Sequence, residues 1–227
     1  AFANQASAAV ESARQLDDMR HLAEHDPLTG LRNRREFEPR ILERLRSADG
    51  GALLVCDLDN FKRVNDSLGH EAGDEVLRRF ADVLRKTTRG TDVPTRLGGE
   101  EFAVLLPGAG RDEALAVAER LRLAVRAAFA GFPASVSVSV GVAASSPELA
   151  TAADLMRAAN RALYAAKRLG RDRVVPYHAE TLSLLAESMF AYIEELSADS
   201  VEGYAEARSR QGGERRRRQR ELLLLLL

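Results

Sequence analysis

Residues 96–102 read RLGGEEF and place two glycines and two carboxylates between two short runs of β-forming residues, 92–97 and 102–106. This arrangement predicts a β-hairpin whose tip carries no bulky side chain. Glycines at the tip would let a phosphate group approach the backbone, and carboxylate oxygens are ligands that Mg²⁺ prefers. A solvated turn has the same composition, so the stretch alone leaves both interpretations open.

A second acidic segment follows a continuous apolar run. Residues 52–56 read ALLVC, which predicts a buried strand, and Asp57 and Asp59 come at its end. Carboxylates in this position, with Lys62 shortly after them, indicate metal ligands followed by a phosphate contact. Asp59 or Asn60 would alternatively cap the helix that begins next, and we assign that role to these two residues. Asp57 lies too early in the sequence to cap it.

The rest of the sequence alternates between helical and extended periodicity. Helices are predicted near 34–47, 61–67, 71–88, 111–129 and 152–169, and strands near 52–57, 134–142 and 173–177 in addition to the hairpin. This alternation predicts an α/β sandwich around a central sheet. Pro94 has no amide hydrogen, so we expect the first hairpin strand to lie at an edge or to be irregular there.

Composition excludes several classes of protein. The 227 residues include 33 basic and 34 acidic ones, a formal net charge of −1, which gives no overall attraction to nucleic acids or membranes. Cys56 is the only cysteine of the sequence, so no intrachain disulfide can form, as is usual in the reducing cytosol. No apolar run approaches the ~20 residues of a membrane-spanning helix. We therefore expect no nucleic-acid partner, no membrane span and a cytoplasmic location, within a parent protein that can itself be membrane-anchored.

Three parts are predicted along the chain. Residues 1–24 form a polar, Ala-rich helix, 25–177 form the domain that carries the motifs, and 178–227 form a helical extension. The basic run at 215–218 is interpreted as a solvated helix face, and the leucines at 222–227 as the opening of a helix that leads toward another domain. Because the sequence begins without a methionine, we expect it to be a fragment of a longer protein.

Five segments, taken together, resemble the family of GGDEF-domain diguanylate cyclases, which condense two GTP molecules into cyclic di-GMP. The segments are DPLTGL at 26–31, DLDNFK at 57–62, the group Asn65, Asp66, Gly69, His70, Gly73 and Asp74, GGEEF at 98–102, and YAAK at 164–167 with Gly170 and Arg171. The resemblance implies a central, mostly antiparallel sheet flanked by helices, the ferredoxin-like, palm-type α/β fold of nucleotidyl cyclases, with helical extensions at both ends.

The resemblance also implies a metal centre and a catalytic group. Asp57, Glu100 and the backbone carbonyl of Leu58 would bind two Mg²⁺ or Mn²⁺ ions, and Glu101 would help to hold the second. Glu100 would further help to deprotonate the 3′-hydroxyl that attacks the α-phosphate. Glu100 replaces the aspartate that is more usual at the third position of the family's signature, and it is still a metal ligand.

Other residues are assigned by the same resemblance to the nucleotide. Phosphates would be held by Phe61, Lys62, Lys167 and Arg171, with Lys62 also counted as catalytic, while Gly98 and Gly99 admit the α-phosphate and Asn65 and Asp74 read guanine. Lys167 and Arg171 would share one helix face if the helix continued through Gly170. Without the resemblance, both would be ordinary basic residues at a helix C-terminus.

The segment RGTD at 89–92 matches the family's inhibitory site, at which the product binds. The resemblance implies that Arg89 contacts a guanine edge or a phosphate and that Asp92 accepts hydrogen bonds from guanine. We therefore expect feedback inhibition by cyclic di-GMP. Taken alone, an Arg-x-x-Asp pair is usually a salt bridge at a helix end.

Each protomer would hold half of the reactants, so the resemblance implies that two copies meet as a homodimer. The helix of residues 1–24 would then be a linker from an upstream sensor, frequently a parallel coiled coil, rather than a helix that packs on its own domain. The alternatives are an inactive receptor for cyclic di-GMP, acting through residues 89–92, and a purely structural dimerisation module. The receptor is disfavoured because such domains usually lose the signature acids, whereas this chain keeps Asp57, Asn65, Asp74, Glu100 and Glu101. The structural module is disfavoured because it gives no reason for five motifs in register.

Overall fold

The computed structural model describes three stretches of the chain, namely residues 23–37, 41 and 50–178. Two predicted parts, the N-terminal helix and the C-terminal extension, lie almost entirely outside these stretches. Of the helix predicted near 34–47, the described residues 34–37 and 41 are helical, and the remainder lies outside the described residues.

The described helices and strands follow the predicted alternation. Their order is β1 (Arg32–Asn33), β2 (Gly51–Asp59), α3 (Phe61–Leu68), α4 (His70–Thr87), β3 (Val93–Gly98), β4 (Glu101–Pro107), α5 (Arg111–Ala128), β5 (Ser137–Ala144), α6 (Ala152–Arg168) and β6 (Val174–Pro176). All belong to the compact unit of residues 1–178 that the internal contacts of the chain define. The bounds of α3 to α6 agree with the predicted helices to within one residue. The short strand β1 was not predicted, and β5 begins later than expected.

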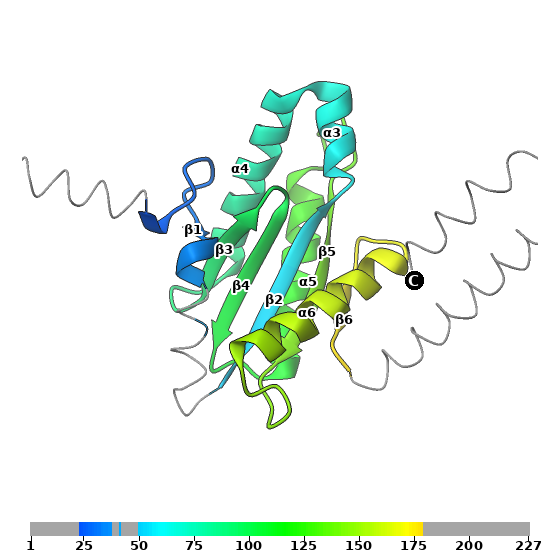
Figure 1. Ribbon diagram of the computed structural model, residues 1–227. Helices are drawn as coiled ribbons and strands as arrows, with labels where there is room; N and C mark the ends of the chain where they lie inside the picture. Colours follow the sequence, from blue (N-terminus) through cyan, green and yellow to red (C-terminus); the bar gives the residue numbers. More distant parts are fainter. Residues whose placement is uncertain (1–22, 38–40, 42–49, 179–227) are drawn as a thin grey trace, which may run out of the picture. The chain divides into compact units, whose positions relative to one another are not determined.

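The strands form one six-stranded sheet in the order β1-β3-β4-β2-β5-β6. The three central pairings, β3 with β4, β4 with β2 and β2 with β5, are antiparallel. The two outer pairings, β1 with β3 and β5 with β6, are parallel. Figure 1 shows α6 in front of this sheet and α4 and α5 behind it. The prediction of a mostly antiparallel sheet flanked by helices is confirmed.

The hydrophobic residues of β2 alternate between the two faces of the sheet, as an extended strand requires. Leu54 and Leu58 belong to the larger core on the side of α4 and α5, and Leu53 belongs to a second core on the side of α6. The same alternation places Asp57 and Asp59 on the α6 side. Every residue of β2 is buried, so each of these carboxylates needs a partner within the protein.

The helix α6 packs directly on β5 because Gly141 has no side chain. A Cβ at this position would lie 2.1 Å from the carbonyl oxygen of Ala159 and 2.2 Å from the amide nitrogen of Leu163. No side chain could be accommodated at those distances without moving the helix backbone. The close approach fixes the height of α6 above the sheet and brings Lys167, about one turn after Leu163, over the end of β2.

The strand β2 continues beyond its predicted end and finishes at Asp59. The Asp59 carboxylate accepts hydrogen bonds from Ser137 and Ser139 of β5, so it does not cap α3. Asn60 occupies the N-cap position with a left-handed backbone (φ 58°), but its side chain makes no capping hydrogen bond. Asn60 is therefore at the predicted N-cap position, whereas the prediction for Asp59 is wrong and neither side chain supplies a capping bond.

The strand β3 is an edge at Pro94, as expected. Pro94 pairs with Val104 of β4, but the pairing of β3 with β1 begins only at Thr95. The missing amide hydrogen of the proline therefore interrupts no ladder on the β1 side. The register shift in the hairpin ladder falls later, between Arg96 and Gly98.

Candidate active site

The hairpin forms as predicted, with Gly99 and Glu100 at its tip between β3 and β4. Gly98 has a φ of 145° and Gly99 a φ of 52°, backbone conformations that residues with a side chain rarely adopt. A Cβ on either glycine would meet nothing within 4 Å. Backbone conformation, rather than crowding, therefore requires glycine here, and the backbone of the turn is accessible to a ligand.

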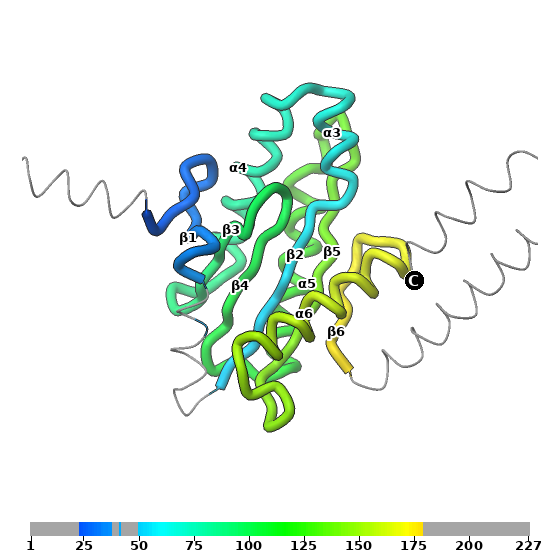
Figure 2. The backbone as a smooth tube through the Cα atoms, in the orientation of Figure 1, coloured from blue at the N-terminus to red at the C-terminus, as the bar shows by residue number. Residues whose placement is uncertain are grey.

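The end of β2 lies beside this turn (Figure 2). The amide of Leu58 donates a hydrogen bond to the carbonyl oxygen of Glu100 at 3.3 Å. The N–H and C=O of one strand residue point to the same side, so the Leu58 carbonyl also faces the turn. Asp57 pairs in register with Glu101 of β4. The acidic residues of both predicted segments thus meet at one end of the sheet.

Asp57 is a buried carboxylate in an acidic neighbourhood, with an exposed fraction of 6%. Burial raises the pKa of Asp57, Lys167 opposes that shift, and Glu100 and Glu101 add to it, so the pKa lies above its ordinary value of 3.8. The charged form of Asp57 is therefore less stable in the folded protein than in water. A positive charge bound among these acids would reverse that penalty.

The cation that the structure places on Asp57 is Lys167 of α6. The Lys167 Nζ lies 2.7 Å from the Asp57 Oδ2, and 34% of the lysine side chain is exposed. A residue predicted to bind metal and a residue predicted to bind phosphate are thus in direct contact. No local sequence pattern indicates this pairing, because the two residues lie on different elements far apart in the chain.

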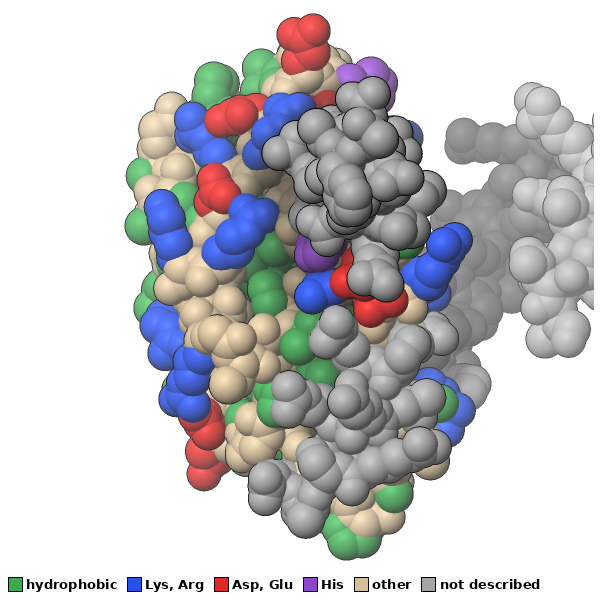
Figure 3. Space-filling model, turned by 90° about the vertical axis from the view of Figure 1, so that its left-hand side faces the viewer, with side chains coloured by type: hydrophobic (Ala, Val, Ile, Leu, Met, Phe, Trp, Pro, Cys, Tyr) green, Lys and Arg blue, Asp and Glu red, His purple; other side chains and the backbone are tan. Residues whose placement is uncertain are grey.

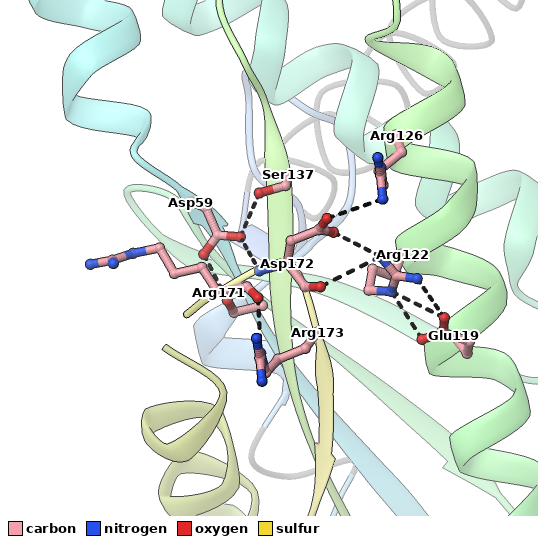
Figure 4. Close-up of polar contacts among 9 residues, drawn as sticks. Asp59, Glu119, Arg122, Arg126, Ser137, Arg171, Asp172 and Arg173 are labelled. Atoms are coloured by element: carbon pink, nitrogen blue, oxygen red, sulfur yellow. Dashed lines mark hydrogen bonds and ion pairs between the residues drawn. The ribbon is translucent and has the colours of Figure 1, made fainter. Parts of the chain in front are cut away.

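Arg171 does not share a helix face with Lys167, contrary to the prediction. The helix α6 ends at Arg168. Gly170, Arg171 and Asp172 then follow with φ values of 113°, 63° and 44°. This turn directs the Arg171 side chain away from the polar cluster around Asp172 (Figure 4). Within the described residues, the Arg171 guanidinium forms no ion pair.

The two residues predicted to read the base come together between α3 and α4. A Cβ at Gly73 of α4 would lie 1.9 Å from the Oδ1 of Asn65 on α3, so the absence of a side chain there lets Asn65 lie against α4. Asp74 is the next residue of α4. Its half-exposed carboxylate lies 3.8 Å from Arg78, a surface pair that leaves it accessible to a ligand.

The remaining predicted phosphate ligands lie at the start of α3, directly after β2. Phe61 is buried and Lys62 is exposed. The first amides of a helix have no partner within the helix and favour an anion. This end of α3 therefore offers backbone donors and the exposed Lys62 ammonium group on the same side of the sheet end as the hairpin turn.

An N-terminal loop holds the hairpin through contacts that were not predicted. The Arg96 guanidinium donates to the Gly99 carbonyl oxygen at 2.9 and 3.1 Å and to the Asp26 carboxylate at 3.0 and 3.1 Å. Asp26 also accepts hydrogen bonds from the amide and hydroxyl of Thr29. Burial raises the pKa of Asp26, but the bonds from Thr29 and Arg96 outweigh burial and lower it. The Asp-Pro-x-Thr pattern at 26–29 is typical of such a turn and is the signal available in the sequence.

The predicted inhibitory residues lie at the opposite end of β3 from the glycine turn. The Arg89 amide donates to the Asp92 carboxylate at 2.7 Å, which closes a turn between α4 and β3. The Arg89 guanidinium is 68% exposed and pairs with Glu113 of α5 at 2.6 Å. Arg89 and Asp92 are thus neighbours, but their side chains do not form the salt bridge that the pattern alone would suggest.

Among the residues that the structure describes, no three Asp, Glu, His or Cys side chains are grouped so that they could hold a metal ion by themselves. Mg²⁺ does not require such a cage, because it is usually bound through one or two carboxylates together with waters and substrate phosphates. The donors at the end of β2 and at the hairpin turn fit that pattern, since Asp57 and Glu100 supply carboxylates and Leu58 supplies a carbonyl oxygen.

Charge on the molecular surface is mixed in sign. Figure 3 shows basic and acidic side chains interspersed on the part of one face that undescribed residues do not cover. This distribution fits the formal net charge of −1. No helix within residues 23–37 and 50–178 is long and apolar enough to cross a membrane.

Comparison with known proteins assigns this fold and its acidic turn to a family. The family model described as diguanylate cyclase, GGDEF domain, matches residues 23–173, and the chain belongs to that family. Diguanylate cyclase DgcP from Pseudomonas aeruginosa is 46% identical over 166 residues, which cover 70% of this chain and 25% of DgcP. The chain therefore spans about a quarter of the length of that relative.

Solved structures share the fold. The coiled coil and GGDEF domain of DgcB from Caulobacter crescentus, in complex with c-di-GMP, has a TM-score of 0.68 and 30% identity, covering 76% of this chain and 95% of that one. The active GGEEF domain of a diguanylate cyclase from Vibrio cholerae has a TM-score of 0.59 and 31% identity, covering 64% and 97%. A second model, the PucR-like N-terminal domain, matches residues 150–227, less than half of the chain.

Proposed function

We propose that this chain is an active diguanylate cyclase that joins two GTP molecules into cyclic di-GMP and releases two pyrophosphates. The observation that carries the proposal is the meeting of Asp57, Glu100 and Lys167 beside an accessible glycine turn. Carboxylates for a divalent cation, an ammonium group for phosphate and an open backbone are what such a transfer requires. A relative described as active carries the same GGEEF signature, which supports the proposal.

In the proposed reaction the 3′-oxygen of one GTP attacks the α-phosphorus of the other. A bond forms between these two atoms, the bond from the α-phosphorus to the bridging oxygen breaks, and pyrophosphate leaves with that electron pair. Glu100, at the hairpin turn, is proposed to accept the proton of the attacking hydroxyl. Two such transfers close the ring.

Asp57, Glu100 and the Leu58 carbonyl are proposed to hold Mg²⁺ or Mn²⁺, with Glu101 helping to hold a second ion. Bound there, the metal would neutralise the charge that accumulates on the phosphate oxygens. The raised pKa of Asp57 supports this assignment. It means that the charged carboxylate is disfavoured in the folded protein, and a cation bound to it would offset that cost.

Lys167, which neutralises Asp57 in this structure, is proposed to turn its ammonium group to the β- and γ-phosphates when nucleotide binds. Lys62 and the Phe61 amide would approach the same phosphates from the start of α3, and Arg171 from the turn after α6. The Gly98-Gly99 turn would admit the α-phosphate. These groups lie on α3, on α6, in the turn after α6 and in the hairpin turn, so the phosphates would be held from several sides.

Asp74 and Asn65 are proposed to select guanine. The Asp74 carboxylate can accept hydrogen bonds from N1–H and the exocyclic amine of guanine, and adenine offers no such pair of donors. A bound adenine would leave the carboxylate unpaired, which disfavours it. The position of Asn65 against Gly73 supports the assignment because it brings the Asn65 side chain to the residue that precedes Asp74 on α4.

The reaction needs two copies of the chain, because each would bind one GTP and the two hairpin turns must face each other. We propose a homodimer whose half-sites are brought together by the N-terminal segment under control of an upstream sensor. The structure of DgcB, which includes a coiled coil with its GGDEF domain, supports such an arrangement.

Binding of cyclic di-GMP at Arg89 and Asp92 is proposed as a feedback control separate from catalysis. The exposed Arg89 guanidinium and the Asp92 carboxylate lie in one turn at a distance from the acidic site. Arg89→Ala should relieve inhibition by added cyclic di-GMP and leave the initial rate unchanged. Unchanged inhibition in this variant, measured as rate against added product, would reject the site.

The function is tested by incubating the purified chain with GTP and Mg²⁺ and quantifying cyclic di-GMP by chromatography. Glu100→Gln is the matched control, because it keeps the size of the side chain and removes its charge. Product from the wild type but not from the variant is the expected result. No product, combined with tight binding of cyclic di-GMP, would favour the inactive receptor, and equal product from both proteins would remove the chemistry from the hairpin.

A further inference from the structure

The turn after α6 has an unusual backbone. Gly170, Arg171 and Asp172 adopt positive φ values in succession, 113°, 63° and 44°, and two of the three residues carry side chains. Such conformations are uncommon outside glycine, cost free energy and persist only where surrounding contacts impose them. The contacts that hold this turn in place therefore indicate its role.

The backbone of the turn is fastened to β2. The Asp172 amide donates to the Asp59 Oδ2 at 3.0 Å. Asp59 is 2% exposed, and its two carboxylate oxygens also accept hydrogen bonds of 2.7 Å from Ser137 and Ser139. Three donors therefore hold the carboxylate in place, so the position of the Asp172 amide relative to the sheet is fixed as well.

The side chain of Asp172 is fastened to α5. Its Oδ1 accepts a hydrogen bond of 2.9 Å from Arg122, whose side chain is only 14% exposed. Arg122 in turn donates three hydrogen bonds, of 2.6 to 3.1 Å, to the Glu119 carboxylate one turn earlier. Arg126 lies 3.4 Å from the other oxygen of Asp172 but is 61% exposed. Arg122 is therefore the main anchor and is itself held in one orientation.

These two attachments leave Arg171 pointing the opposite way. Figure 4 shows the Asp172, Arg122 and Arg126 side chains converging on α5, while the Arg171 side chain extends from the other side of the turn. Asp59, which holds the Asp172 amide, lies two residues after Asp57 on the same strand face. The direction of Arg171 is thus set relative to the strand that carries the proposed metal ligand.

We propose that the Arg122–Asp172 ion pair is a positioning device that holds Arg171 in the orientation that binds the terminal phosphates of the nucleotide. Arg122 and Asp172 touch no substrate in this proposal and act through Arg171. The inference rests on the proposed function, which supplies the nucleotide. A partly buried ion pair is poor evidence for added stability, but it does select one geometry, which is what a strained turn carrying a ligand residue needs.

The proposal is tested by calorimetric titration of the full chain with a non-hydrolysable GTP analogue and with GMP, which lacks the β- and γ-phosphates. Arg122→Gln and Arg171→Ala should each weaken binding of the analogue about tenfold, the loss expected for one charge-assisted contact, and leave GMP binding unchanged. In the double variant, Arg122→Gln should have no additional effect, because the residue that it positions is absent. Arg126→Gln, which removes an equal charge from the same helix, is the matched control and should change binding less than twofold.

A second variant separates positioning from general damage to the fold. Asp172→Asn keeps a residue that tolerates a left-handed backbone and removes the charge that holds Arg122. It should weaken binding of the analogue by less than Arg122→Gln, with GMP binding unchanged. Amide hydrogen exchange of the turn should accelerate in Arg122→Gln while the exchange of β2 stays slow.

The outcomes distinguish this inference from the proposed function. If the wild type binds the analogue and Arg171→Ala weakens it, but Arg122→Gln does not, the positioning role is wrong and the proposed function stands. Additive losses in the double variant, or equal losses for GMP and the analogue, would also overturn the positioning role. If the wild type binds no guanine nucleotide, the proposed function fails and the inference falls with it.

Discussion

Asp57 and Asp59 are two carboxylates on one strand and one face, yet the protein surrounds them differently. Asp59 is 2% exposed and accepts hydrogen bonds from two serine hydroxyls of β5 and from one backbone amide. Asp57 is 6% exposed, and its ion-pair partner among the described residues is Lys167. Two glutamates of the hairpin oppose its charge and raise its pKa further. Burial is nearly equal at the two positions, and the partners differ.

This difference shows how a strand can carry a structural acid and a functional acid two residues apart. A carboxylate whose acceptor positions are filled by neutral donors of its own fold fixes those donors, and its removal leaves them unpaired. A carboxylate that faces other acids is disfavoured as an anion. The free-energy cost of its charge is offset only when a cation is bound beside it. Loss of Asp59 should therefore act on stability, and loss of Asp57 on activity.

The largest expected effect follows from Asp57→Asn. Cyclic di-GMP formation should fall about 100- to 1,000-fold, because a group that stabilises charge in the reaction is lost, as measured by initial rates with saturating GTP and Mg²⁺. The free energy of unfolding at pH 7 should rise by about 0.5–2 kcal/mol, because a disfavoured buried charge is removed. A variant that is inactive and also less stable would make Asp57 a structural residue like Asp59.

The pH dependence of stability gives an independent check on the same variant. Because the pKa of Asp57 is raised above 3.8, the folded protein binds the proton more tightly than the unfolded chain does. The wild type should therefore lose stability as the pH rises through the raised pKa, and Asp57→Asn should not. The advantage of the variant in urea unfolding should be absent at acidic pH and constant above the raised pKa. An advantage independent of pH would have another cause.

The next largest effect is expected from Asp59→Ala. Two serine hydroxyls and the Asp172 amide would lose their acceptor in a buried place, so the free energy of unfolding should fall by about 3 kcal/mol in urea titrations. Asp66→Ala, an exposed acid of α3, is the matched control and should change stability by less than about 0.5 kcal/mol. A loss no greater than that of the control would remove the contrast between the two carboxylates.

The contrast also explains which site residues could be predicted from the sequence. Asp57 and the hairpin were found because a buried strand followed by acids, and a double glycine between β-forming runs, are local signals. Asp59 was misassigned as a helix cap because an acid before a helix is also a local signal. Its true partners, Ser137, Ser139 and Asp172, lie 78, 80 and 113 residues away, beyond the reach of any pattern.

The turn after α6 was not predicted for the same reason. A glycine at 170 predicts a helix end, but the left-handed backbones of Arg171 and Asp172 depend on Asp59 and Arg122, which come from β2 and α5. The sheet, by contrast, follows from alternating periodicity, and its core strands appeared where expected. Only β1, with two residues, was too short to give a periodic signal. Features set by neighbouring residues could be predicted from the sequence, and contacts between distant elements could not.

An intermediate effect is expected from Asp26→Asn, which tests whether catalysis requires the contact between Asp26 and the hairpin. Arg96 would lose its carboxylate partner and would hold the Gly99 carbonyl less firmly, so the free energy of unfolding should fall by about 1.5 kcal/mol and kcat about tenfold. Glu75→Gln, which breaks an exposed ion pair with Arg79, is the matched control and should leave both nearly unchanged. A stability loss without any loss in kcat would show that the glycine turn keeps its geometry without this contact.

The smallest expected effect is a displacement of the pH profile in Lys167→Met. Burial raises the pKa of Asp57 and the lysine opposes that shift, so removing the lysine should raise the pKa further. The acidic limb of kcat/KM, which reports the free enzyme, should then move to higher pH. Arg171→Met also removes a proposed phosphate ligand but has no contact with Asp57, so it should lower kcat/KM without moving the limb. Equal displacement in both variants would assign the limb to the nucleotide phosphates. Asp57, the acid that differs from Asp59 in its partners, would then not be the group that titrates in catalysis.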